Sequence, residues 1–175
     1  MRRRNWLAVA AAVLMMTAVL PMQAFAVTRD QAMDWLKERE GTYVGRNQEC
    51  VALLEQYYEE LFGLSVDGDA KYYMNNMGED WTQLEYVEGE PFEVMPGDVC
   101  VWTVSNCDKV DETTGLTWGE LYGHVGIVCE NLEDGFTYYG QNPDPVHLDT
   151  CNYEWYQAEG WVFWGVVRPS FEENH

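Results

Sequence analysis

The second half of the chain carries four short runs of β-branched and aromatic residues, and these runs limit the fold more than any other feature. Each run is introduced by glycine or followed by residues that favour turns, which is typical of β-strands. They predict an antiparallel sheet built from the segments GDVCVWTV (97–104), GHVGIVCE (123–130), GFTYYGQN (135–142) and GWVFWGVVRP (160–169).

Two earlier segments have apolar residues at helical spacing instead. Residues 28–40 predict a helix with Thr28 as its N-cap. A second helix is expected from about Gln48 to Leu61, because Gly63 follows as a stop signal. Residues 67–90 show no regular period. Helices first and strands afterwards predict an α+β domain in which N-terminal helices pack on an antiparallel β-sheet.

The first 26 residues have the order of parts of a secretory signal peptide. Arginines at 2–4 precede an apolar run from Trp6 to Leu20, and small residues stand before a cleavage point after Ala26. The apolar run is shorter than the roughly 20 residues of a membrane-spanning helix. We therefore expect a secreted protein whose residues 27–175 form a single domain, without membrane contact after cleavage.

The chain is strongly acidic, with a formal net charge of −20 over 175 residues. Cleavage would remove three basic residues and no acidic ones, which leaves about −23. Nucleic-acid binding needs lysine and arginine against phosphate, so this charge argues against nucleic acid as a partner. It also argues against tight electrostatic adhesion to anionic membranes or cell-wall polymers. The charge favours solubility outside the cell, and we assume a monomer.

The five cysteines all follow the predicted signal peptide. Disulfides are possible in an exported protein, but an odd number leaves at least one thiol unpaired within the chain. No pair has the CxxC spacing of a structural zinc site, so no metal is predicted. If Cys50 is the free thiol, three pairings remain open among the other four, Cys100, Cys107, Cys129 and Cys151.

Cys50 stands where a loop of glycine, arginine and asparagine gives way to the second helical pattern. With Asn47 as the N-cap, Cys50 lies in the first helical turn, where free backbone N–H groups favour a thiolate. The neighbouring Glu49 opposes thiolate formation. From local sequence alone, a nucleophile, a disulfide partner and a small apolar side chain all remain open for Cys50.

His124 is the histidine best placed to act as a base, because it starts a predicted strand directly after Gly123. A thiol at a helix start and an imidazole at a strand start are far apart in sequence but can meet in the fold. Asn142, at the end of the next strand, could orient the imidazole. A structural histidine and an ordinary turn asparagine are the alternatives.

Four motifs together resemble one family. GTYVGRNQECVALLEQYY, PGDVCVW, GHVGIV and GQN, in this order, are similar to the CHAP family of cysteine, histidine-dependent amidohydrolases/peptidases. The resemblance covers about residues 38–170 and implies a papain-like α+β fold. Members typically cut peptidoglycan, so the resemblance implies that polymer as the partner, in a bacterial cell wall.

The resemblance assigns roles to matching positions. It implies Cys50 as nucleophile, His124 as base and Asn142 as the third member. The usual acidic position is Gly140 here, and Glu49 stands where many members have glutamine. Ala52 occupies a calcium-ligand position of some phage members, so no cofactor is expected. The substrate-contact candidates are Gln48, Trp102, Tyr122 and Gln141, and aromatic residues Trp118 and Tyr139 are further groove candidates.

The leading hypothesis is a secreted peptidoglycan hydrolase, either an N-acetylmuramoyl-L-alanine amidase or a stem or cross-bridge endopeptidase. The departures at Gly140 and Glu49 keep a second hypothesis open, a catalytically weak or inactive wall-binding module. A third is an extracellular thiol protease or peptide amidase that uses the same chemistry on another substrate.

Overall fold

The computed structural model describes residues 27–45 and 47–172 of the chain. The signal peptide predicted for residues 1–26 lies outside the described residues. Within the described ranges, no helix is long and apolar enough to cross a membrane.

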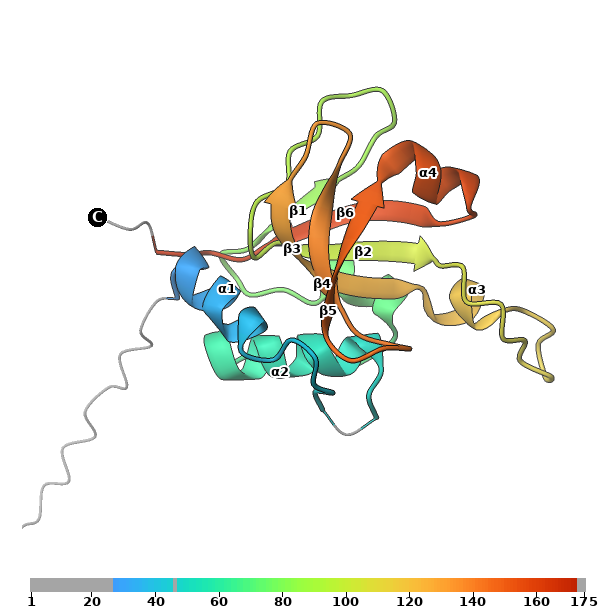
Figure 1. Ribbon diagram of the computed structural model, residues 1–175, viewed down its shortest axis with the longest axis horizontal. Coiled ribbons are helices and arrows are strands. Elements are labelled where there is room, and N and C mark those ends of the chain that lie inside the picture. The colour runs from blue at the N-terminus through green and yellow to red at the C-terminus, as the bar shows by residue number, and fades with distance from the viewer. Residues whose placement is uncertain (1–26, 46, 173–175) are drawn as a thin grey trace, which may run out of the picture.

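Six strands form one sheet in which every neighbouring pair is antiparallel, as the α+β prediction requires (Figure 1). Their order across the sheet is β1-β6-β2-β3-β4-β5. The four glycine-linked runs of the sequence give β2, β3, β4 and β6, so that part of the prediction is confirmed. The strands are β1 (Thr82–Glu85), β2 (Val99–Val104), β3 (His124–Asn131), β4 (Gly135–Gly140), β5 (His147–Asn152) and β6 (Val162–Arg168).

Two N-terminal helices pack on this sheet, and both were expected. Thr28 caps α1 through a capping box with Gln31. The second helix, α2, ends at Gly63, whose φ of 66° lies in the left-handed region that glycine adopts without strain. The helical segments are α1 (Arg29–Lys37), α2 (Cys50–Phe62), the 3₁₀ helix η1 (Ala70–Asn75), α3 (Trp118–Tyr122) and α4 (Tyr153–Ala158).

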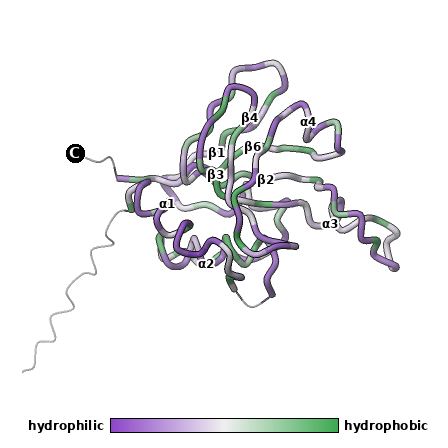
Figure 2. Tube along the Cα trace, in the orientation of Figure 1, coloured by the Kyte–Doolittle hydropathy of each residue, from purple (hydrophilic) through white to green (hydrophobic). Residues whose placement is uncertain are grey.

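Both faces of the sheet are buried in its central strands. In β2, Val99 and Val101 pack toward α1 and α2, whereas Cys100 and Trp102 pack into a second cluster that includes Tyr156 of α4. Successive side chains of a strand point to opposite faces, so burial on both sides explains the continuous apolar run of β2. Figure 2 shows hydrophobic residues along these central strands and hydrophilic ones on the outer helices.

Four short elements lie outside the predicted set: β1 and η1 within the irregular stretch 67–90, and α3 and α4. The fifth strand, β5, begins at His147 and was not predicted either. β1 and β5 are the two edges of the sheet and have mostly exposed side chains. An edge strand with little buried surface has no apolar alternation for sequence reasoning to detect.

A buried carboxylate joins three distant segments of the fold. Asp98, at the start of β2, is fully buried and accepts hydrogen bonds from both Nε and Nη2 of Arg168 at the end of β6. The backbone N–H of Met95 donates to it at 2.8 Å, and Arg29 of α1 lies 3.8 Å away. Burial raises the pKa of Asp98 despite these partners. A carboxylate held in this way fixes where β2 begins.

We expect Asp98→Ala to lower the free energy of unfolding by about 3 kcal/mol, because it leaves the Arg168 guanidinium partly buried without its partner. Urea denaturation followed by tryptophan fluorescence measures this. Asp34→Ala is the matched control, since Asp34 forms an exposed pair with Lys37 and should change stability little. Equal effects of the two variants would contradict the assigned role of Asp98.

Candidate functional site

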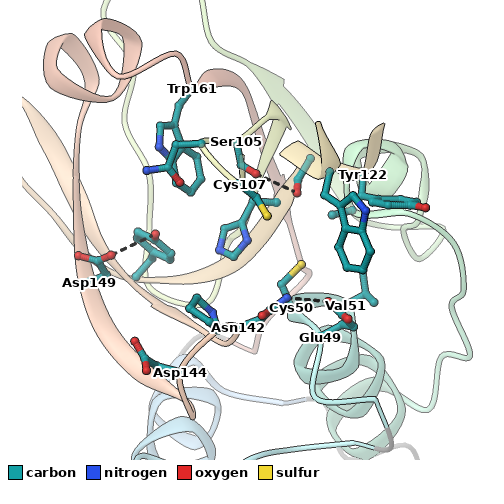
Figure 3. Close-up of a pocket in the computed structure, with 18 of the residues that line it drawn as sticks. Glu49, Cys50, Val51, Ser105, Cys107, Tyr122, Asn142, Asp144, Asp149 and Trp161 are labelled. Carbon is teal, nitrogen blue, oxygen red and sulfur yellow. Dashed lines mark hydrogen bonds between the residues drawn. The ribbon is translucent and has the colours of Figure 1, made fainter. Parts of the chain in front are cut away.

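A cavity of about 810 Å³ opens where the start of α2 meets the ends of several strands (Figure 3). The first residues of α2 and β3 form its base, and α3 and α4 contribute walls. Cys50, His124 and Asn142, which the sequence singled out as catalytic, all line this one cavity. The fold therefore brings together three residues that lie far apart along the chain.

Cys50 is the first residue of α2, two positions nearer the start of the helix than expected. Glu49, not Asn47, is the N-cap, and Asn47 instead accepts a hydrogen bond from the Glu49 backbone. Glu49 makes no side-chain cap, so no capping side chain occupies the Cys50 and Val51 amides. Gln48 has a φ of 59°, in the left-handed region, and this turn precedes the start of the helix.

The Cys50 thiol is buried, and burial is the main reason that its pKa rises to about 11. The carboxylate of Glu49 raises it further. Backbone N–H groups of Val125, Val51 and Cys50 itself oppose this, because they stabilise the thiolate. Val125 directly follows His124, so its contact with the sulfur links the thiol to the start of β3.

His124 begins β3, and Gly123 makes its position possible. Gly123 has a φ of 70°, and a Cβ there would collide with the carbonyl oxygen of Trp102. The His124 ring packs against aromatic rings, with centroids 5.6 Å from Trp102 and 5.4 Å from Trp161. This enclosure lowers the pKa of His124 to about 4, a fall that Asp149 partly offsets.

The two shifts have a joint chemical consequence. A thiol with a raised pKa and an imidazole with a lowered pKa are both uncharged at neutral pH. These two directions argue against a preformed thiolate–imidazolium ion pair. A neutral imidazole is a proton acceptor, so the arrangement suits a histidine that takes the thiol proton as the sulfur attacks.

Gly140 leaves one edge of His124 without a carboxylate. A Cβ at position 140 would lie 3.6 Å from Nε2 of His124, so a side chain there would meet the imidazole. Asn142 lies in the cavity wall, but its amide donates to the Glu49 carboxylate at 2.6 Å. Among the described residues, no hydrogen bond joins Asn142 to His124.

Gln141 is fully buried and does not line the cavity. Its amide nitrogen donates to the backbone carbonyls of Val44 and Glu49 at 2.9 and 3.0 Å, and its carbonyl accepts from the Val44 N–H at 2.6 Å. These bonds tie the end of β4 to the loop that precedes Cys50. Gln141 thus supports the site from behind.

Only some of the other candidates for substrate contact line the cavity. Tyr122 lines the cavity and is 42% exposed, and Trp118 lines it too. Trp102 is fully buried beneath the His124 ring, and Tyr139 belongs to the core under α2. Gln48 is exposed but lies outside the cavity lining.

Four further lining residues were not among the site residues predicted from the sequence. Cys107 is an exposed thiol in the long β2–α3 connection, and Figure 3 shows it turned into the same cavity as Cys50. Asp149 comes from the edge strand β5, and Trp155 and Trp161 come from α4 and the turn after it. Only the aromatic density of WYQAEGW hinted at this wall.

The five cysteines are all free in the described structure, and Cys50, Cys100 and Cys151 are buried. Across the described ranges, no three His, Cys, Asp or Glu side chains gather in a way that could hold a metal ion.

Comparison with known proteins identifies the fold. No family model and no curated protein matches the chain. Among solved structures, the wild-type endolysin LysIME-EF1 is similar, with a TM-score of 0.63 and 19% identity over 83% of this chain and 66% of that one. Ly7917 is similar with a TM-score of 0.52 and 20% identity, over 82% and 63% of the two chains.

A second structure, Ly7917 with the hydrolyzing product of MDP, has a TM-score of 0.53 and 18% identity, again over 82% of this chain. The chain spans just under two thirds of the length of these solved chains. At such low identity the likeness establishes a shared fold.

We expect Glu49→Gln to lower the pKa of the Cys50 thiol, since it removes the neighbouring carboxylate that raises it. At pH 8, iodoacetamide should then alkylate Cys50 about threefold faster than it does in the protein with Glu49. The rate is measured by mass spectrometry of the Cys50 peptide in a Cys107→Ser background, because Cys107 is also accessible.

Glu59→Gln is the matched control, since it removes the same charge from an exposed position near the other end of α2. An unchanged alkylation rate in Glu49→Gln would show that the carboxylate does not govern the thiol.

Proposed function

We propose that this protein is a peptidoglycan hydrolase of the CHAP type, which cleaves an amide bond by cysteine-dependent acyl transfer. One observation carries the proposal: Cys50 at the start of α2 and His124 at the start of β3 line the same cavity. The fold shared with the endolysin LysIME-EF1 supports a cell-wall substrate. The structure of Ly7917 with the hydrolyzing product of MDP supports the same substrate class.

In the proposed reaction, His124 takes the thiol proton as the sulfur of Cys50 attacks the amide carbonyl carbon. The C–N bond then breaks, and His124 returns the proton to the leaving amine. Water, activated by His124, hydrolyses the resulting thioester and releases the acid. The N–H groups of Cys50 and Val51, which contact the Cys50 sulfur, would stabilise the oxyanion of each tetrahedral intermediate.

Asn142 is a positioning residue in this scheme. Its bond to Glu49 holds the carboxylate that would otherwise be free to move toward the thiol. Gln141 is also a positioning residue, because its side-chain amide holds the backbone of Val44 and Glu49 in the loop before Cys50. We further propose that the protein acts outside the cell after removal of residues 1–26.

A second candidate function is a wall-binding module with little or no activity. The raised pKa of Cys50 and the glycine at position 140 favour it, because both weaken the nucleophile and its base. This candidate predicts binding to peptidoglycan without release of soluble fragments.

We expect residues 27–175 of the wild type to release soluble fragments from purified peptidoglycan under reducing conditions. Cys50→Ala and His124→Ala should each reduce the rate at least about 10³-fold, because both side chains take part in bond breaking. Loss of turbidity and mass spectrometry of the products measure this. Cys107→Ser, which changes the other cavity thiol, should retain activity, and all variants should keep similar melting temperatures.

The products distinguish the bond that is cut. New N-terminal alanine indicates the amidase, and new amine ends inside the peptide indicate the endopeptidase. Cleavage of a protein substrate without any wall product would replace the proposal with an extracellular thiol protease. Binding without products would favour the wall-binding module.

The pH dependence should show no loss of kcat/KM through the range where an ordinary histidine gains a proton. Since burial lowers the pKa of His124 from 6.5 to about 4, the imidazole stays neutral and able to accept a proton down to about pH 5. Activity should rise toward alkaline pH, because the Cys50 thiol gives up its proton more readily there. A decline in kcat/KM centred near pH 6.5 would contradict the enclosed state of His124.

A further inference from the structure

One side of the cavity is an aromatic surface that no step of the proposed reaction uses. We call it the α4 wall. It consists of Asp149, Trp155, Tyr156, Glu159 and Trp161, all of which line the cavity. Trp155 is 58% exposed, which is unusual for the largest apolar side chain.

The rings of the α4 wall form a continuous row that ends at His124, the proposed proton acceptor. Trp155 packs edge-on against Tyr156 with centroids 5.5 Å apart, and Tyr156 lies 4.7 Å from Trp161. Trp161 in turn packs on His124 at 5.4 Å. A ligand held along this row would therefore reach the imidazole.

Two carboxylates border the row. Asp149 lies within 3.5 Å of the Tyr138 hydroxyl, which also contacts the hydroxyl of Tyr156, and Figure 3 shows Asp149 at the cavity edge with Trp161. Glu159 follows α4 directly and is exposed. No lysine or arginine of the described chain lines the cavity.

The α3 side of the cavity differs from the α4 wall in having a cation against an aromatic ring. There, Lys109 places its ammonium 3.3 Å from the ring centroid of Trp118. The cation–aromatic pairs within the described ranges do not involve the α4 wall. Trp155 is the most exposed ring of the α4 wall, and no cation of the described residues lies against it.

We propose that the α4 wall binds a primary ammonium group of a peptide substrate, such as a lysine-type side chain or a free amino end. Aromatic faces attract cations through their negative π-surface, and neighbouring carboxylates add to the attraction. The role of this binding in hydrolysis rests on the proposed function, but the binding itself can be measured separately.

A neutral sugar ring is the competing ligand for aromatic side chains, and the charge distinguishes the two. A sugar would gain from the rings but nothing from two carboxylates beyond hydrogen bonds. An anionic peptide would meet Asp149 and Glu159, and none of the described lining residues is a lysine or an arginine. The combination of rings and carboxylates fits a cation best.

Calorimetry with the Cys50→Ala variant of residues 27–175 tests the binding without turnover. The probes are an Ala-isoGln-Lys peptide with a free side-chain amine and the same peptide with that amine acetylated. We expect the free amine to bind about tenfold more tightly at 0.15 M salt. Trp155→Ala and Glu159→Gln should each remove most of this difference, and Trp155→Phe should retain part of it.

Glu154→Gln is the matched control, since it removes the same charge from α4 at an exposed position outside the cavity lining. Equal binding of the two peptides would overturn the inference. So would binding of an uncharged wall disaccharide that depends on Trp155 but not on Glu159, which would assign the wall to a sugar ring. Hydrolysis of peptidoglycan by the intact enzyme is measured separately, so its absence would reject the proposed function while leaving the binding result to stand.

Discussion

The side-chain amide of Gln141 connects the sheet to the loop that carries the candidate nucleophile. It sits in the interior at the end of β4 and makes hydrogen bonds with the backbone of Val44 and Glu49. Buried amides that lose their partners are costly, so these bonds define one position of the loop. Because Glu49 is the N-cap of α2, the same bonds also determine where the helix begins and where the Cys50 thiol points. The place of Cys50 in the cavity that it shares with His124 therefore depends on this connection.

Burial then decides the chemical state of the pair. The cavity base encloses both side chains, which raises the pKa of the Cys50 thiol and lowers that of His124. These shifts favour the uncharged form of both side chains near neutral pH, so in the proposed reaction the thiol would give up its proton as it attacks. Because position 140 is glycine, no carboxylate stands there beside Nε2 of His124 to raise the pKa of the imidazole. Asp149 acts in that direction from β5. The site therefore relies on longer-range charge and on backbone N–H groups.

The sequence predicted the elements that have a strong period or a strong cap. The central strands, the Thr28 capping box and the Gly63 stop are confirmed, because burial on both faces and cap chemistry leave marks in local sequence. The edge strands β1 and β5 and the short helices α3 and α4 were missed, since they bury few side chains. The cap of α2 was placed at Asn47, but Glu49 holds that position because Gln48 turns the chain in the left-handed region.

For the site, the sequence by itself determined which residues are the candidates: a thiol at a helix start, a histidine after a glycine and an asparagine at a strand end. Tertiary structure alone decided that these three line one cavity, that the Asn142 amide engages Glu49, and that Gln141 and Trp102 lie behind the cavity. It also brought Cys107 and the α4 wall to the same cavity. The physical reason is that local sequence encodes turns, caps and periodicity, whereas the distance between remote side chains is set by the packing of the sheet against its helices.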